Sequence, residues 1–298
     1  MSDTERPTKK YRGNCHCAAF VFEIELPEIK LARECNCSIC VKKGYMWVVT
    51  ENHPTIVRGE DALVGYQFAS KTMEHHFCRN CGTAVMGKAP TGVGINVRAL
   101  QDVDIWALEI EKRSYKMRLT RSRYNGDTRE PHYVPPVYSG PEPSPAGFDE
   151  GKTYHGSCHC GAVTAAVKVK EPLEDGAYKE PIVECNCSLC RRGGYIWIYP
   201  LKNQISIQGS ENLTYYVHGT RIGRIGKCKT CGVQVYIDLN PLTDEEIAEL
   251  PEEVRDTRSR LIDLRLFNLR TLNDLDLGRV QTERRDGWNE RGPPYVNP

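Results

Sequence analysis

The arrangement of 14 cysteines constrains this chain more than any other feature of its 298 residues. They form two sets of seven, and each set reads CxC, then CxCxxC, then CxxC. Cys35 of the first set has its partner 150 positions on, at Cys185, and neighbouring residues recur as well (ECNCSIC and ECNCSLC). The CxC pairs are offset by only 143 positions, because the second copy carries seven extra residues near 171–177. A period this long excludes a solenoid repeat and indicates a duplicated domain.

The duplication predicts two domains joined by a linker. We expect the first domain at 1–138 and the second at 152–298, with a linker at 139–151, because the stretch 135–152 is rich in proline and glycine. The copies differ most at 240–260. There Thr243 precedes three acidic residues and predicts a helix start, and Pro251 should end or restart that helix. We interpret this insertion as a surface excursion in preference to a lid.

The remaining sequence is typical of a mainly β protein. Short segments rich in β-branched or aromatic residues predict strands, and long helical periodicity is absent; the segments are 18–26, 45–50, 55–57, 94–97 and 233–239. The net charge of +1, from 40 Lys+Arg against 39 Asp+Glu, argues against a strongly basic nucleic-acid-binding protein. No apolar run approaches the roughly 20 residues of a membrane helix, and no secretory signal is recognisable. We therefore expect no membrane partner and a cytoplasmic location.

Fourteen thiols in a reducing compartment indicate metal or redox chemistry. A structural zinc takes four protein ligands and a catalytic zinc keeps one position open, so seven thiols divide naturally into four and three. We expect closed, structural sites at Cys15, Cys17, Cys78, Cys81 and at Cys158, Cys160, Cys228, Cys231. The open, catalytic sites would be Cys35, Cys37, Cys40 and Cys185, Cys187, Cys190. An alternative partition joins Cys37 and Cys40 with Cys78 and Cys81 in a zinc-ribbon-like site.

These motifs together resemble the glutathione-dependent formaldehyde-activating enzyme family, also known as the GFA/CENP-V domain. The matching residues are GNCHC and GSCHC at 13–17 and 156–160, the two CxCxxC triplets, and CxxCG at 78–82 and 228–232. The resemblance implies two tandem β-tent domains with two zinc ions each, up to four per chain. It also implies structural roles for the CxC and CxxC pairs and a catalytic role for the triplets. The activity it implies is carbon–sulfur lyase chemistry that joins or separates glutathione and formaldehyde.

The function we expect is a zinc-dependent carbon–sulfur lyase. Its substrate would be a small molecule, either a glutathione adduct or a related thiol/carbonyl conjugate, in detoxification or in a biosynthetic pathway, with glutathione as a candidate co-substrate. The alternative is a non-catalytic zinc scaffold or a module that binds nucleic acid or protein. The basic segment 112–123 (KRSYKMRLTRSR) is the feature that favours nucleic acid, but its alternation also suits a half-exposed strand, and we do not expect nucleic acid as a partner. The third hypothesis is a thiol redox sensor.

Several recurring residues near the triplets leave two interpretations open. Basic residues after each triplet could meet substrate carboxylates or form a solvated turn: Lys42, Lys43, Arg191 and Arg192. Aromatic residues could line a pocket or fill the core: Tyr45, Trp47, Tyr195 and Trp197. Alternation in a strand would place Asn96 and Arg98 on one face, for substrate contact or for a salt bridge. A histidine ligand shared by both copies is not expected, since His75, for example, corresponds to Ile225.

Overall fold

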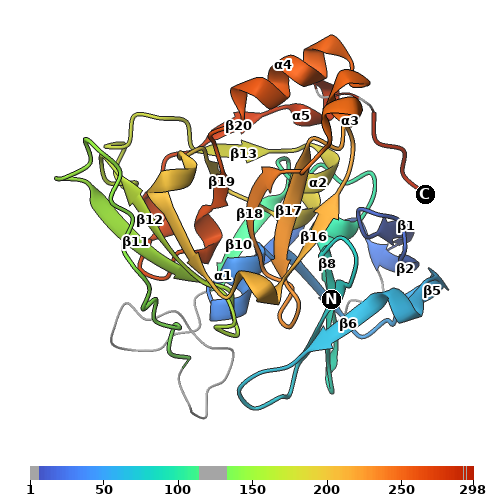
Figure 1. Cartoon of the computed structure of the whole chain (residues 1–298). Coiled ribbons are helices and arrows are strands. Elements are labelled where there is room, and N and C mark those ends of the chain that lie inside the picture. The colour runs from blue at the N-terminus through green and yellow to red at the C-terminus, as the bar shows by residue number, and fades with distance from the viewer. Residues whose placement is uncertain (1–6, 114–132, 291, 293) are drawn as a thin grey trace. The chain divides into compact units, whose positions relative to one another are not determined.

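The computed structural model describes residues 7–113, 133–290, 292 and 294–298 (Figure 1). The chain divides into two compact units. The first consists of residues 1–134 together with Ser188–Gly194 and Tyr295–Pro298, and the second of Pro135–Cys187 and Tyr195–Pro294. In the described residues, each unit contains one three-stranded sheet and one seven-stranded sheet. The expected mainly β architecture with two similar domains is thus confirmed. Most of the basic segment 112–123 lies outside the described residues.

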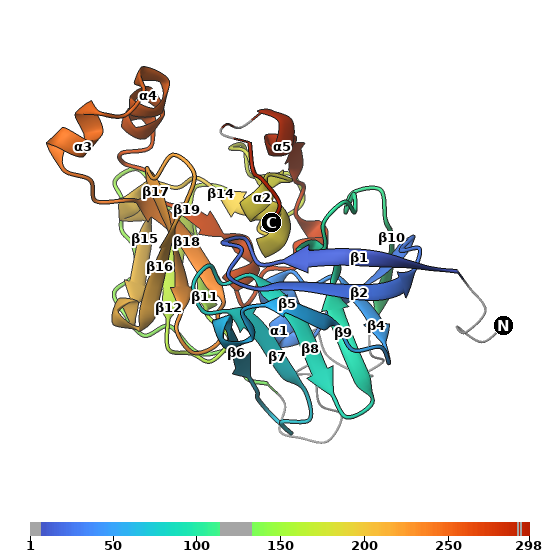
Figure 2. The ribbon, with the colours of Figure 1, turned by 90° about the vertical axis from the view of Figure 1, so that its right-hand side faces the viewer.

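The first unit contains two sheets that run in different directions (Figure 2). The three-stranded sheet has the order β1 (Thr8–Asn14), β2 (Val21–Pro27), β5 (Thr55–Arg58). The seven-stranded sheet has the order β10 (Glu109–Arg113), β3 (Leu31–Cys35), β4 (Trp47–Thr50), β9 (Gly92–Asn96), β8 (Ala84–Ala89), β7 (Glu74–Cys78), β6 (Leu63–Tyr66). Among the strands that the structure describes in this unit, only β10 and β3 pair in parallel. Helix α1 (Ser38–Lys43) connects β3 to β4.

The second unit repeats this topology strand for strand. Its three-stranded sheet has the order β11 (Lys152–Ser157), β12 (Thr164–Val169), β15 (Ile205–Gln208). Its seven-stranded sheet runs β20 (Glu283–Arg285), β13 (Val183–Cys185), β14 (Trp197–Ile198), β19 (Leu266–Asn268), β18 (Gln234–Leu239), β17 (Gly223–Cys228), β16 (Leu213–Val217). Again one outer pair, β13 and β20, is parallel. Helix α5 (Gly287–Glu290) is short, and helix α2 (Ser188–Gly193), which follows β13 in the sequence, belongs to the first unit.

Alternating side chains build the core of each unit. In β2, Phe22, Ile24 and Leu26 are buried, whereas Glu23 and Glu25 point outward, as the two-residue period of a strand requires. Full burial of one such apolar side chain stabilises the fold by roughly 2 kcal/mol. Gly13 on the paired strand is needed here, because a Cβ atom would lie 2.3 Å from the Phe22 ring. The sheets therefore form a close-packed platform for the cysteines at their ends.

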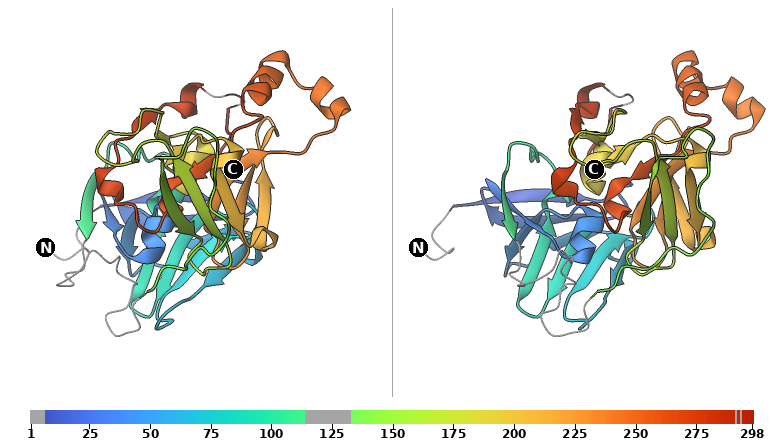
Figure 3. Two further views of the ribbon diagram at one scale, coloured as in Figure 1. Left: turned by 60° about the vertical axis from the view of Figure 1, so that its left-hand side comes forward. Right: turned by 90° about the vertical axis from the view of Figure 1, so that its left-hand side faces the viewer.

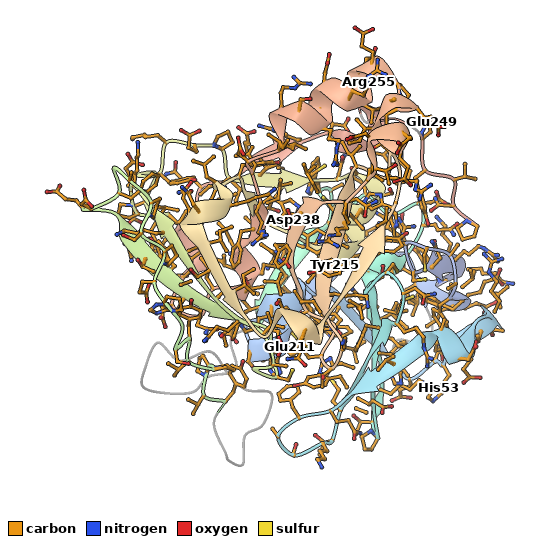
Figure 4. All side chains as sticks on the ribbon, viewed as in Figure 1. His53, Glu211, Tyr215, Asp238, Glu249 and Arg255 are labelled. Carbon is orange, nitrogen blue, oxygen red and sulfur yellow. The ribbon has the colours of Figure 1, made fainter. Side chains whose placement is uncertain are left out.

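The insertion at 240–260 forms two short helices, as expected. Thr243 caps α3 (Asp244–Ala248) in a capping box with Glu246, and Pro251 immediately precedes α4 (Glu252–Arg260). Neither helix has a buried residue, and both extend away from the sheets of their own unit (Figure 3). Arg255 donates to the carbonyl of Ala248 and holds the two helices together (Figure 4). In the part of the chain that the structure describes, no helix is long and apolar enough to cross a bilayer.

Candidate metal centre

Four cysteines from distant segments meet in each unit. Cys15, Cys17, Cys78 and Cys81 have all four sulfur atoms within 4.8 Å of one another, and so do Cys158, Cys160, Cys228 and Cys231. The measured Sγ–Sγ distances of 3.6 Å from Cys17 to Cys15 and to Cys78 are too long for a disulfide, which needs about 2 Å. The zinc-ribbon-like alternative is not formed: the structure groups Cys78 and Cys81 with the CxC pair and not with Cys37 and Cys40.

The donor set of these clusters fits zinc. Four thiolates at about 2.3 Å from a tetrahedral zinc lie about 3.8 Å apart, close to the 3.6 Å observed in both units. Backbone amides also point at the sulfurs: Phe20 N lies 3.3 Å from Cys15 Sγ, and Val163 N lies 3.3 Å from Cys158 Sγ. Such N–H donors stabilise thiolates. The four-cysteine clusters are therefore suited to structural zinc.

Tight turns bring each pair of sulfurs together. After the first CxC, Ala18 has a positive φ of 60° and donates its N–H to Cys15 O; Gly161 occupies the same position in the second repeat with φ 85°. The CxxC turns end at Gly82 and Gly232, which also have positive φ and donate to Cys78 O and Cys228 O. Glycine adopts this conformation without a steric penalty, which explains the CxxCG motif.

Three cysteines form each remaining cluster. The sulfur atoms of Cys35, Cys37 and Cys40 lie within 4.8 Å of one another, as do those of Cys185, Cys187 and Cys190. The local chain explains this, because Cys35 ends β3, Cys37 is the N-cap of α1 and Cys40 lies in the first turn of α1. No fourth histidine, cysteine or carboxylate joins either triplet among the described residues. The triplets thus offer three ligands and one open position.

The sulfurs of the first triplet influence one another. Hydrogen bonding to Cys37 lowers the pKa of Cys35 to about 3, and the same contact raises the pKa of Cys37 to about 12. The first thiolate formed therefore accepts hydrogen bonds from the remaining thiols. A divalent cation would favour loss of all three protons. Cys35 is partly exposed, so this site is reachable from solvent.

Aromatic side chains pack against the first triplet. The indole Nε1 of Trp47 donates a 3.2 Å hydrogen bond to Cys40 Sγ, and Tyr45 stacks on Trp47 with 4.0 Å between ring centroids. His75 lies 5.5 Å from the Tyr45 ring. Burial lowers the pKa of His75 to about 3, with Lys43 and His76 contributing, so its imidazole is neutral at pH 7. Trp47 and Tyr45 are buried as core residues are, yet they also line the metal site.

The basic residues after the second triplet are not a solvated turn. Ser188–Gly194 belongs to the first unit, where Arg191 Nη2 donates to Leu100 O and Val103 O at 2.6 and 2.7 Å. Arg192 is fully buried and donates to Asn14 O and Oδ1 and to Asn297 Oδ1. Both guanidinium groups thus hold α2 in place, and the expectation of a solvated turn was wrong. Lys42 and Lys43 in α1 are also buried.

The predicted strand face of Asn96 and Arg98 is also wrong. The strand ends at Asn96, and Arg98 lies in a 3-10 turn (Val97–Ala99). Asn96 accepts from Met46 N and Arg98 N and donates to Ala84 O, so it closes the end of the strand. Arg98 Nε donates to Gly44 O at the end of α1. Asn268 makes the equivalent bonds in the second unit, which indicates a structural role for both asparagines.

A separate hollow of about 300 Å³ lies on the first unit, away from the cysteines. Its lining includes His53, Gly65, His76 and Met86 (His53 is labelled in Figure 4). In the second repeat Tyr215 and Tyr236 stand at the positions of Gly65 and Met86, and their hydroxyl oxygens lie 2.9 Å apart. The hollow therefore reflects smaller side chains in the first repeat and contains none of the predicted site residues.

Sequence reasoning missed His75 because it searched only for histidines shared by both copies. The one signal available was its place in a strand just before Cys78, where alternation puts it on the inner face with Phe77. The role of Asn14 and Tyr295 in holding α2 was also missed, because these contacts join residues far apart in sequence.

Comparison with known proteins identifies a family for this sequence. The family model of the glutathione-dependent formaldehyde-activating enzyme matches residues 10–112 and 153–258, which together exceed half of the chain. A crystal structure of a Rhodobacter sphaeroides protein is also similar, with 32% sequence identity and a TM-score of 0.32. The match covers 34% of this chain and 99% of that one.

Proposed function

Because this chain belongs to the glutathione-dependent formaldehyde-activating enzyme family, with two copies of the domain, we propose that it is a zinc-dependent carbon–sulfur lyase. The substrate class is a thiol–carbonyl adduct, R–S–CH(R′)–OH, with glutathione as the preferred thiol. The observation that carries this proposal is the contrast between clusters of four cysteines and clusters of three. Four thiolates saturate a zinc ion, whereas three leave a position for substrate.

The proposed reaction is a reversible cleavage. The C–S bond breaks and its electron pair stays on sulfur, while the hydroxyl oxygen forms the carbonyl and its proton passes to solvent or to the released thiolate. Zinc at the triplet would supply Lewis acidity that stabilises the developing negative charge. The protein's own part is to hold three sulfurs in one turn and to surround them with Trp47 and Tyr45, which limit water.

The three cysteines of the first triplet differ in their exposure to solvent. Cys37 and Cys40 are buried and Cys35 is partly exposed, so a small adduct can approach one side of the cluster. The hydrogen bonds from Cys37 N to Cys35 Sγ (3.4 Å) and from Trp47 to Cys40 Sγ fix two of the three ligands. A preorganised ligand set of this kind lowers the reorganisation needed during the reaction.

The test measures exchange between free and glutathione-bound formaldehyde by NMR, together with zinc content by elemental analysis. Wild type should contain about four zinc ions and accelerate exchange over the buffer rate. Cys37→Ser/Cys187→Ser should retain about two zinc ions, remain folded and lose the acceleration. A folded wild type with about four zinc ions and no acceleration for any thiol–carbonyl pair would favour a non-catalytic scaffold instead. About two zinc ions in wild type would leave the triplets without metal and contradict the proposal.

A further inference from the structure

Several buried polar atoms of the first unit have no hydrogen-bond partner among the described residues, and His76 Nδ1 is one of them. Two of these atoms lie on neighbouring side chains that are only 2% and 3% exposed, namely the Tyr45 hydroxyl and His75 Nδ1. A buried polar atom without a partner destabilises a folded protein, and native structures contain few of them. Two such atoms in one place therefore call for an explanation, and a bound ligand that supplies the missing partners is one.

Both groups lie beside the first cysteine triplet. The Tyr45 and His75 rings are 5.5 Å apart, and Tyr45 stacks on Trp47, whose indole donates to Cys40 Sγ. The side chains that carry the two unpartnered atoms thus pack beside the cluster that has an open ligand position.

We propose that Tyr45 and His75 bind the hydroxyl group of the adduct, so that the first repeat selects substrates with a hydroxyl next to the C–S bond. This inference rests on the proposed lyase function. A hydroxyl both donates and accepts, and so does a phenol, while a neutral imidazole donates with one nitrogen and accepts with the other. A carboxylate fits less well, because it would be desolvated among aromatic rings and repelled by three thiolates.

The second repeat lacks this pair. Ile225 stands at the position of His75, 150 residues further on, and isoleucine offers no hydrogen bond. Hydroxyl selection is thus a property of the first repeat. The two repeats have equivalent cysteine clusters but differ in the residue proposed to bind the hydroxyl group of the substrate.

The first test measures thermal stability of the zinc-loaded protein. Tyr45→Phe removes a hydroxyl without a partner, so its melting temperature should rise by a few degrees. Tyr11→Phe is the matched control, because the Tyr11 hydroxyl is also buried but accepts a 3.0 Å hydrogen bond from Ile29 N. That variant should melt at a lower temperature than wild type. A fall for Tyr45→Phe like that of Tyr11→Phe would show a structural partner and overturn the proposal.

The second test compares binding of two stable analogues by calorimetry. They are S-ethylglutathione and S-(2-hydroxyethyl)glutathione, whose hydroxyl lies one carbon further from sulfur than that of the adduct, because a hydroxyl on the carbon bonded to sulfur would make the compound a labile adduct. Wild type should prefer the hydroxyl compound about tenfold, as expected for one or two satisfied hydrogen bonds. His75→Ile, which copies the second repeat, and Tyr45→Phe should reduce this preference to threefold or less. His76→Ile is the control: His76 Nδ1 also lacks a partner, but this side chain lies on the other face of β7, where its Nε2 contacts Glu74 and it lines the separate hollow. It should retain the full preference.

The outcomes separate the two proposals. An unchanged preference in His75→Ile and Tyr45→Phe would overturn the role of the pair and leave the lyase proposal intact. Equal binding of both analogues by wild type would likewise overturn the role of the pair and leave the lyase proposal intact. A zinc-loaded wild type that binds neither would overturn glutathione as the thiol and, with it, this inference.

Discussion

At the scale of single residues, each repeat has one buried lysine at one pair of corresponding positions, but the lysine occupies a different position of the pair in each repeat. In the first repeat Lys43 lies on α1, with its Nζ atom 4.1 Å from the centre of the Phe77 ring. In the second repeat the equivalent positions hold Gly193 and Lys227. Lys227 is buried and donates a 2.6 Å hydrogen bond to Thr214 Oγ1. Each repeat thus keeps one ammonium group at this pair of positions, on the helix in one case and on the strand in the other.

This difference between the repeats predicts that substitutions at positions 43 and 77 have strongly coupled effects on the free energy of unfolding. Phe77→Lys should lower the free energy of unfolding by about 3 kcal/mol, because it places two ammonium groups in one buried region. Adding Lys43→Gly should restore more than half of the loss, and Val64→Thr should improve it further, since Val64 pairs with Phe77 as Thr214 pairs with Lys227. Chemical denaturation of the zinc-loaded variants measures the effect. A double variant no more stable than Phe77→Lys alone would contradict the coupling.

At the scale of elements, the location of α2 is the least expected feature. Although α2 lies within the second repeat of the sequence, it belongs to the first unit. Arg192 contacts the Tyr295 ring, whose hydroxyl donates to His16 O and accepts from Asn14 Nδ2. Burial lowers the pKa of Arg191 to about 10, so Arg191 remains charged at pH 7 and needs the two carbonyl oxygens it binds. These contacts explain why basic residues follow the second triplet.

The segment at 171–177, present only in the second repeat, is anchored by two carboxylates, of which Asp175 pairs with Arg279 at the surface and Glu174 is the more buried. Glu174 accepts hydrogen bonds from the Tyr154 hydroxyl and from Lys152 Nζ, and Leu173 N donates to the same Tyr154 hydroxyl. Burial acts to raise the pKa of Glu174, but these hydrogen bonds outweigh it, and the pKa is lowered. Ionised Glu174 therefore stabilises the folded state at pH values above its ordinary pKa, and the contribution is lost as the pH falls through the lowered value.

We expect Glu174→Gln to cost about 1–2 kcal/mol of unfolding free energy at pH 7, as hydrogen bonds to charged groups do. The difference from wild type should stay constant above about pH 5 and shrink as the pH is lowered below 4. Urea denaturation at several pH values measures it, with substitution of the half-buried Glu171 (Glu171→Gln) as a control. A difference that grew on acidification would contradict the assignment.

The sequence allowed prediction of those features that follow from local pattern. The strands and the capping of α3 by Thr243 could be predicted because hydrophobic alternation and capping are local. The four-cysteine groups could be predicted because zinc chemistry demands four ligands and paired motifs supply two each. The position of α2, the backbone contacts of Arg191 and the turn at Arg98 could not, since each depends on packing between residues about 50 to 180 positions apart. The place of His75 beside the first triplet was not predicted, because only histidines present in both repeats were considered as ligands.

At the scale of the whole molecule, the two kinds of cluster should differ in their effect on stability. Each four-cysteine cluster joins segments more than 60 residues apart, whereas each triplet lies within six consecutive residues. A metal that joins distant segments contributes its binding free energy to folding, and one bound to a single turn contributes much less. With zinc bound, the long-range clusters would therefore act as cross-links within each unit.

Accordingly, Cys15→Ser should lower the melting temperature of the zinc-loaded protein substantially, by 10 °C or more at roughly 2–4 °C per kcal/mol. Cys37→Ser should lower it by only a few degrees. Scanning calorimetry with parallel zinc analysis would compare the two, since each variant should lose about one zinc ion. Equal shifts for both variants would contradict the distinction between the clusters.

The composition of the first unit has a consequence for synthesis of the chain. Residues 1–134 leave the ribosome first, but the unit they form also includes Ser188–Gly194 and Tyr295–Pro298. At about 5–20 residues per second, those last residues follow Val134 by roughly 10–30 s. Until Arg192 has been made, Asn14 lacks its guanidinium group, and until Pro298 has been made, Arg12 lacks its carbonyl. The unit that begins first along the chain is thus completed only after Tyr295–Pro298 have been synthesised.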